Sequence, residues 1–152
     1  DPICLVDLFA TCADIIGQQI ADTAAEDSVS QLPNLLGTTK SPVREAVVHH
    51  SINGSFAIRQ GNWKLIFCPG SGGWSSPKPG KANDVQEWVQ LFDLSADLAE
   101  TTNLAKEHPE IVERMTKLAQ QYINNGRSTP GNKQKNAGET HLYPEWIKKV
   151  RP

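Results

Sequence analysis

The stretch Phe56-Ala-Ile-Arg-Gln-Gly-Asn-Trp-Lys-Leu-Ile-Phe-Cys68 decides the fold of this chain. Its centre, Gly61-Asn62, is typical of a turn and separates two runs rich in aromatic and β-branched residues. In the second run Trp63, Leu65 and Phe67 recur at every other position, as in a strand that buries one face. The stretch therefore predicts two antiparallel strands, at 55–59 and 63–68, joined by a tight turn.

Two further strands extend this pair into a meander. Upstream, 46–51 is a third strand-like run, and Asn53-Gly54 is the strongest short hairpin signal known. Asn53-Gly54-Ser55 also matches a glycosylation acceptor, and we favour the turn. Downstream, 87–93 predicts the fourth strand after a Gly-, Pro- and Ser-rich loop at 69–83, which is longer than ordinary connections and is therefore functional or mobile.

One long helix follows the meander. Pro109 suits the first helical turn, Glu110 suits the positive N-terminal end, and Gly126 follows the end, so we predict a helix over 109–125. An apolar stripe along it can cover a sheet face. We expect an α+β fold, a four-stranded antiparallel sheet packed by a long C-terminal helix, followed by a polar tail from Arg127.

A second helix is predicted before the sheet, at 5–16. Its apolar residues share one face of a 3.6-residue period, and Gly17 sits at the place of a C-terminal cap. A short helical turn follows within 28–37. This apolar face has no strand partner in the preceding sequence, so the helix looks like an element left over from a larger α/β domain. The stripe consists of Leu5, Leu8, Phe9, Cys12, Ile15 and Ile16.

Composition narrows the class of protein. The chain has 152 residues, 38% of them hydrophobic, and a formal net charge of −2. These values suit a globular chain of one domain or slightly more, with no charge excess for binding nucleic acid and no apolar run that could span a membrane. The three cysteines, Cys4, Cys12 and Cys68, are too few for a disulfide scaffold and leave their redox state open. The opening Asp1-Pro2-Ile3 suggests a piece of a longer protein.

Three residues are candidates for substrate binding, and a tryptophan is a fourth residue that could contact a ligand. His49 and His50 stand side by side on a predicted strand, so one imidazole faces the core and the other faces solvent or a cleft. An imidazole can donate to an anionic oxygen, although a hydrogen-bonded strand histidine is the commoner role. Arg127, in a Gly/Pro-framed loop, could clamp a sulfate, phosphate or carboxylate, or lie in a solvated tail. Trp74 could stack on a sugar or aryl ring, or fold back over apolar surface.

Several catalytic motifs are absent from the sequence. Gly80-Lys81 lacks the preceding glycine and the following Ser/Thr of a phosphate loop, and there is no GxSxG elbow. The histidines and cysteines show neither CxxC nor HExxH spacing, so we expect no metal site in this chain.

Four blocks of sequence, in this order, resemble the C-terminal quarter of sulfatases of the arylsulfatase A type. They cover nearly the whole chain, with Leu98 where the family usually has Pro. The resemblance implies that 1–42 ends the large α/β domain and that 43–152 forms the small C-terminal subdomain. The blocks are Asp7–Gly17, Ser30–Gly37, Phe56–Ile66 and Gln90–Leu104.

The resemblance also implies a catalytic nucleophile and a metal site whose sequence motifs this chain lacks. Such enzymes use a formylglycine, made from the Cys or Ser of a Cys-x-Pro-x-Arg motif, and a calcium ion held by Asp and Asn side chains. None of the three cysteines has that context, and no Asp-Asp pair begins a calcium cluster. We therefore expect no catalytic residue and no cofactor in this chain, with calcium in the full-length parent.

The expected function is the C-terminal part of a sulfatase acting on aryl or carbohydrate sulfates, inactive alone, with His49, His50 and Arg127 lining the substrate pocket. Its expected partners are the missing N-terminal sulfatase domain, the sulfate ester, and a second copy through the exposed N-terminal helix. The family suggests a periplasmic or extracellular location. The alternatives are a non-enzymatic carbohydrate-binding or interaction module and part of a related phosphate-ester hydrolase.

Overall fold

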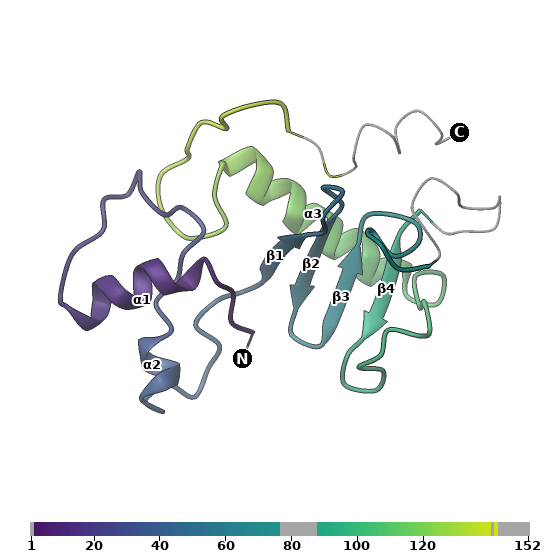
Figure 1. The fold of residues 1–152 in the computed structure, drawn as a ribbon, viewed down its shortest axis with the longest axis horizontal. Coiled ribbons are helices and arrows are strands. Elements are labelled where there is room, and N and C mark those ends of the chain that lie inside the picture. Colours follow the sequence, from purple (N-terminus) through teal and green to yellow (C-terminus); the bar gives the residue numbers. More distant parts are fainter. Residues whose placement is uncertain (1, 77–87, 141, 143–152) are drawn as a thin grey trace. The chain divides into compact units, whose positions relative to one another are not determined.

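The structure is a computed structural model that describes residues 2–76, 88–140 and 142 (Figure 1). The chain divides into two compact units, one formed by Asp1–Val47 with Gln121–Thr140 and the other by Val48–Gln120 with His141–Pro152. The boundary lies five residues beyond the division predicted after residue 42, and the first unit also takes in the end of the long helix and the segment after it. The predicted assignment of these parts to two sulfatase domains stays a prediction.

The second unit is built on the predicted meander. Four strands lie in the order β1-β2-β3-β4, and the pairs β2–β3 and β3–β4 are antiparallel. The fold prediction of a four-stranded antiparallel sheet with a C-terminal helix is confirmed. The predicted strand start at Glu87 and the loop residues 77–83 lie outside the described residues. The strands are β1 (Val47–His50), β2 (Phe56–Gln60), β3 (Trp63–Ile66) and β4 (Gln90–Asp93).

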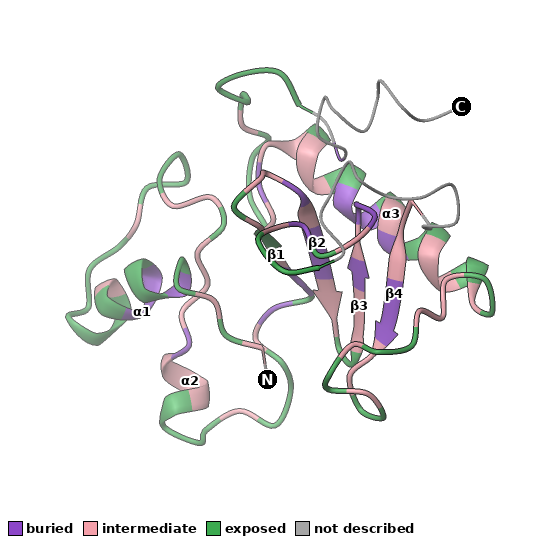
Figure 2. Cartoon of the chain, turned by 45° about the vertical axis from the view of Figure 1, so that its right-hand side comes forward, coloured by how far each residue is buried: buried purple, intermediate pink, exposed green. Residues whose placement is uncertain are grey.

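The core of this unit lies on one face of the sheet. Ile58, Leu65 and Leu91 stand opposite one another in register and are completely buried. Helix α3 (Pro109–Asn125) runs along the sheet and buries Met115 fully (Figures 1 and 2). Arg114 of α3 donates to the side chain of Gln60, which shares the face of Ile58, so α3 covers this face.

Side-chain hydrogen bonds hold the loop that follows β4. Asn103 accepts from the Leu91 N–H (2.9 Å) and donates to the Val89 carbonyl (3.2 Å), which fastens the loop to the strand. The Asp97 carboxylate accepts from the backbone N–H groups of Thr101 (2.7 Å) and Thr102 (2.8 Å). These residues belong to the block Gln90–Leu104 that carries part of the resemblance, and their contacts are those of a rigid turn.

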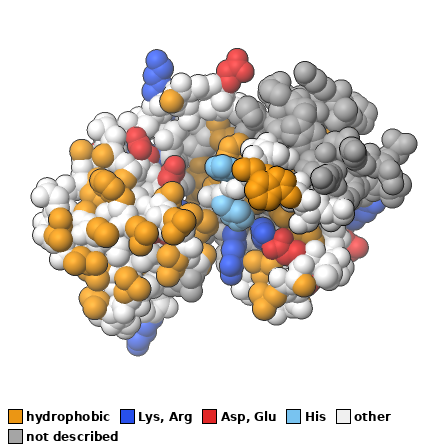
Figure 3. Space-filling view, in the orientation of Figure 1, with side chains coloured by type: hydrophobic (Ala, Val, Ile, Leu, Met, Phe, Trp, Pro, Cys, Tyr) orange, Lys and Arg blue, Asp and Glu red, His pale blue; other side chains and the backbone are white. Residues whose placement is uncertain are grey.

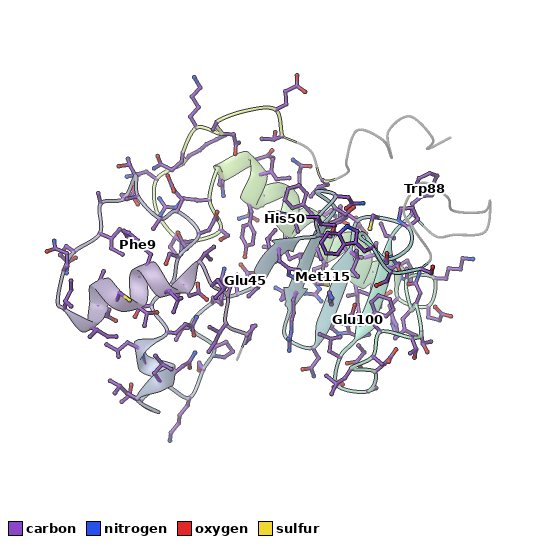
Figure 4. The ribbon with its side chains drawn as sticks, viewed as in Figure 1. Phe9, Glu45, His50, Trp88, Glu100 and Met115 are labelled. Carbon is purple, nitrogen blue, oxygen red and sulfur yellow. The ribbon has the colours of Figure 1, made fainter. Side chains whose placement is uncertain are left out.

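The first unit contains the N-terminal helix α1 (Asp7–Ile15) and the short α2 (Leu32–Leu35). Helix α1 begins two residues later than predicted, because the Asp7 carboxylate accepts from the Cys4 N–H (3.0 Å) and closes a turn over Leu5 and Val6. The predicted apolar stripe is exposed: Leu5 by 83%, Phe9 by 59% and Ile16 by 76%. Hydrophobic side chains gather on this part of the surface in Figure 3, and Phe9 is labelled in Figure 4.

The buried face of α1 carries polar residues instead. Asp7 and Thr11 are almost completely buried together with Ala10. The Thr11 hydroxyl accepts from the Gln31 N–H (2.9 Å), and the Asp7 carboxylate forms an ion pair of 2.5 Å with the buried Arg44. Hydrogen bonds to distant segments therefore fix α1 in this unit.

Candidate functional site

The two predicted histidines lie at the end of β1, on the second unit. The His49 side chain is exposed, but neighbouring groups desolvate it in part and so lower its pKa; the nearby Lys64 lowers it further, while Glu100 acts in the opposite direction. His49 is therefore a neutral imidazole at neutral pH, able both to donate and to accept hydrogen bonds.

Lys64 and Glu100 form an ion pair beside His49. The Lys64 Nζ lies 2.6 and 2.8 Å from the two carboxylate oxygens of Glu100, and both side chains are mostly shielded from water. Glu100 has a φ of 56°, a left-handed backbone conformation that costs free energy in a residue with a side chain. The turn fixed by Asp97 holds Glu100 in this conformation next to Lys64.

His50 is exposed at the same end of β1. Its Nδ1 lies 3.0 Å from the Ser51 carbonyl oxygen, and its ring meets Phe56 edge-on at 6.2 Å. Because a carbonyl oxygen only accepts, this contact places the proton on Nδ1 and leaves Nε2 as the acceptor of a neutral imidazole. His50 can thus accept a hydrogen bond from a hydroxyl group of a ligand.

Arg127 lies in the first unit, where it holds a loop together. Its Nη1 donates to the Asp22 carboxylate (2.8 Å) and to the Asn132 carbonyl (3.0 Å), and its Nη2 donates to the Thr129 hydroxyl (3.0 Å). Arg127 is only 8% exposed, so its guanidinium is an internal cross-link of residues 22–27 and 127–134. The hydrogen bond from Arg127 also lowers the pKa of the Asp22 carboxyl.

The described residues show no centre for metal or nucleophilic chemistry. Within 2–76, 88–140 and 142, no group of three or more His, Cys, Asp or Glu side chains is placed to hold a metal ion. All three cysteines are free, and burial raises the pKa of the Cys68 thiol. No described helix has the length and apolar character needed to cross a membrane.

The sequence did not single out Lys64, Arg59 or Glu100. A signal was available in the sequence for Arg59 and Lys64. Each is the immediate neighbour of a buried strand residue, so its side chain lies on the other face of the sheet, away from α3. Figure 3 shows histidine, basic and acidic side chains close together over the sheet. Glu100 lies 36 residues from Lys64 in the sequence, a separation that no local pattern bridges.

The second unit is a two-layer α+β unit in which α3 covers one face of the sheet and Arg59 and Lys64 lie on the other. Residues 42–149 match the family described as the C-terminal region of aryl-sulfatase, and this chain belongs to that family. Members of this family form part of sulfatases, which suggests a metal in the parent enzyme.

Curated relatives are sulfatases of much greater length. The chain is 37% identical over 123 residues to an N-acetylgalactosamine-6-O-sulfatase of Bacteroides thetaiotaomicron, covering 74% of this chain and 22% of that protein. It is 31% identical over 121 residues to a choline-sulfatase of Rhizobium meliloti, covering 78% and 20% respectively. The chain thus spans about a fifth of the length of these relatives.

A solved structure is similar to the same portion. It is described as part of the metabolism of multiple glycosaminoglycans by Bacteroides thetaiotaomicron and matches with a TM-score of 0.57 and 34% identity, over 76% of this chain and 24% of that one. The recognition of this chain as a C-terminal sulfatase portion is therefore confirmed.

Proposed function

We propose that this chain is the C-terminal part of a sulfatase that hydrolyses sulfate esters of carbohydrates. The match of residues 42–149 to the C-terminal region of aryl-sulfatase supports this function best. The 37% identical relative is named for the sulfate of an aminosugar, which favours a carbohydrate ester over a simple aryl ester. The nucleophile and the calcium ion belong, in this proposal, to the parent's N-terminal domain.

The proposed contribution of this chain is to line the substrate pocket through His49, His50 and Arg127. A neutral His49 and the Nε2 of His50 can hydrogen-bond sugar hydroxyls on the leaving-group side of the ester. Arg127 is tied to Asp22, so a sulfate would have to compete with that carboxylate for the guanidinium. The histidines are therefore the stronger part of the proposal.

Kinetics of the protein encoded by the complete reading frame test this function. We expect turnover of N-acetylgalactosamine 6-sulfate, no turnover by the 152-residue chain alone, and a fall of about tenfold in kcat/KM for His50→Ala. Lys117→Ala, on an exposed residue of α3, is the control and leaves kcat/KM unchanged. Preference for a phosphate ester would instead assign the protein to the related hydrolases, and unchanged kinetics of both His50→Ala and Arg127→Ala would remove these residues from the pocket.

The proposed partner of the apolar face of α1 is the parent's large domain, and in the isolated chain a second copy. Exposed apolar patches of this kind mark interfaces, and Leu5, Phe9 and Ile16 are each more than half exposed. Light scattering should show self-association of the 152-residue chain and a monomer for Leu5→Ser/Phe9→Ser. A wild-type monomer would contradict self-association. We further propose a periplasmic or extracellular location, which fractionation of cells tests.

A further inference from the structure

One end of the sheet gathers three segments that the mechanism proposed above does not use. Because β1 to β4 form a meander, the turn 51–55, the segment 67–76 and residues 88–89 all lie where β1 ends and β4 begins. Figure 4 shows His50 and Trp88 toward this end, whereas Glu100 lies toward the other. All of these segments belong to the second unit.

The described part of the loop after β3 is fixed to this end on both sides. Gln90 Nε2 donates to the carbonyls of Cys68 (2.7 Å) and Gly70 (2.8 Å), which fastens the loop to β4. At Gly72 an added Cβ would lie only 3.0 Å from the Ser51 hydroxyl, so the loop backbone packs directly on the β1–β2 turn. Gly72 also has a φ of 67°, which only glycine adopts readily.

This fixed loop presents a large aromatic side chain to solvent. Trp74 is 83% exposed, and Ile52, whose Cγ2 would contact a Cβ at Gly73 at 3.6 Å, is 69% exposed. The Ser71 hydroxyl donates to the Ser75 carbonyl (2.8 Å) and closes the turn that carries Trp74. Trp63, by contrast, packs edge-on against His108 at 5.2 Å. We call Ile52 and Trp74 the Trp74 platform.

We propose that the Trp74 platform binds a sugar ring of a sulfated glycan outside the residue that is cleaved. This inference rests on the proposed function and assigns it a polymeric substrate. A pyranose ring has a face of C–H groups rimmed by hydroxyls, so it can stack on the indole of Trp74. A loop already fixed before binding loses little conformational freedom when the sugar arrives.

The size of the platform argues against a protein partner. Stable protein interfaces bury about 800 Å² on each side, with aromatic anchors surrounded by further apolar contacts. The platform offers one indole and one isoleucine, an area that matches a single sugar ring.

Titration of the 152-residue chain with a chondroitin 6-sulfate hexasaccharide tests the platform without relying on turnover. The indole N–H signal of Trp74, assigned by its loss in Trp74→Phe, should shift on binding. We expect Trp74→Ala to raise Kd about tenfold and Trp74→Phe to raise it less, because Phe keeps an aromatic face. Leu98→Ala is the matched control, since Leu98 is equally exposed, at 83%, beyond the opposite end of β4.

Kinetics of the complete protein separate this inference from the proposed function. Trp74→Ala should lower kcat/KM for the hexasaccharide about tenfold and leave kcat/KM for the monosaccharide N-acetylgalactosamine 6-sulfate unchanged. Turnover with no shift of the Trp74 signal, or with equal losses on both substrates, overturns the platform and leaves the sulfatase intact. Binding through Trp74 without turnover of any sulfate supports the platform and overturns the sulfatase.

Discussion

The buried ion pair between Asp7 and Arg44 should make the first unit sensitive to the loss of either charge. The two side chains are 1% and 5% exposed and 2.5 Å apart. The Asp7 carboxylate also accepts from the backbone of Val29 (3.1 Å) and Cys4 (3.0 Å) and from the Gln31 side chain (3.1 Å), so every acceptor position faces a donor.

Removing one partner leaves the other charge buried and unpaired. Breaking such a pair costs about 3–5 kcal/mol, and we expect a loss in this range for Arg44→Met. Asp7→Asn keeps the shape, but its NH2 group must face two N–H donors whichever way the amide turns, and we expect a loss of at least about 2 kcal/mol. In the double variant the two losses should fall short of additivity by about 1–3 kcal/mol, because both remove the same interaction.

Urea unfolding followed by circular dichroism measures these losses, and hydrogen exchange locates them. The amide protons of Val29 and Cys4 donate to Asp7 and should lose protection in Asp7→Asn. Lys117→Ala is the control, because its 2.6 Å pair with Glu113 is as short but 75% and 66% exposed, and it should cost no more than about 0.5 kcal/mol. A loss below about 1 kcal/mol for Arg44→Met, or strict additivity of the two substitutions, would refute this account of the first unit.

Two further predictions concern the loop of Arg127 and the titration of His49. A Cβ at Gly131, where φ is 146°, would overlap Arg127 and Asp22, so Gly131→Ala should lower the melting temperature. Gly138→Ala is the control and should not lower it, because a Cβ there would have nothing within 4 Å. Equal melting temperatures of the two variants would contradict the clash at Gly131. In an NMR titration of its ring protons, His49 should titrate below its usual pKa of 6.5. Because the folded state then binds this proton less readily than the unfolded state, the stability linked to His49 is complete above that pH and is lost as the pH falls. Lys64→Met should raise that pKa and Glu100→Gln should lower it, and movement in the same direction for both would count against the electrostatic assignment.

Elements with local signals were predictable from the sequence. Helix α3 has the predicted bounds, because Pro109 and Gly126 act on their own neighbours. The two turns of the meander follow from Gly54 and Gly61, which have φ values of 79° and 58°. The strands are shorter than predicted at several ends, since pairing with a neighbouring strand, which no local pattern specifies, sets where a strand stops.

The chemistry around the candidate site was less predictable, because it depends on long-range contacts. The sequence placed His49 and His50 side by side, but the pKa of His49 depends on Lys64 and Glu100, which meet across 36 residues. Likewise the partner of Arg127 is Asp22, 105 residues away, and nothing near Arg127 in the sequence indicates that carboxylate. Residue types can be read locally, whereas their partners require the fold.

Helix α1 shows that the period of its apolar residues does not determine which face of the helix is buried. The 3.6-residue period identified an apolar stripe, and the usual inference is that such a stripe faces the core. Here the opposite face is buried, because Asp7 and Thr11 accept hydrogen bonds from donors in 28–31 and 44 that satisfy them away from water. The polar contacts that anchor α1 leave Leu5, Leu8 and Phe9 exposed. A helix held by its polar face and exposed on its apolar face has the form of an interface element, and this form is the basis of our proposal that the stripe contacts the parent's large domain.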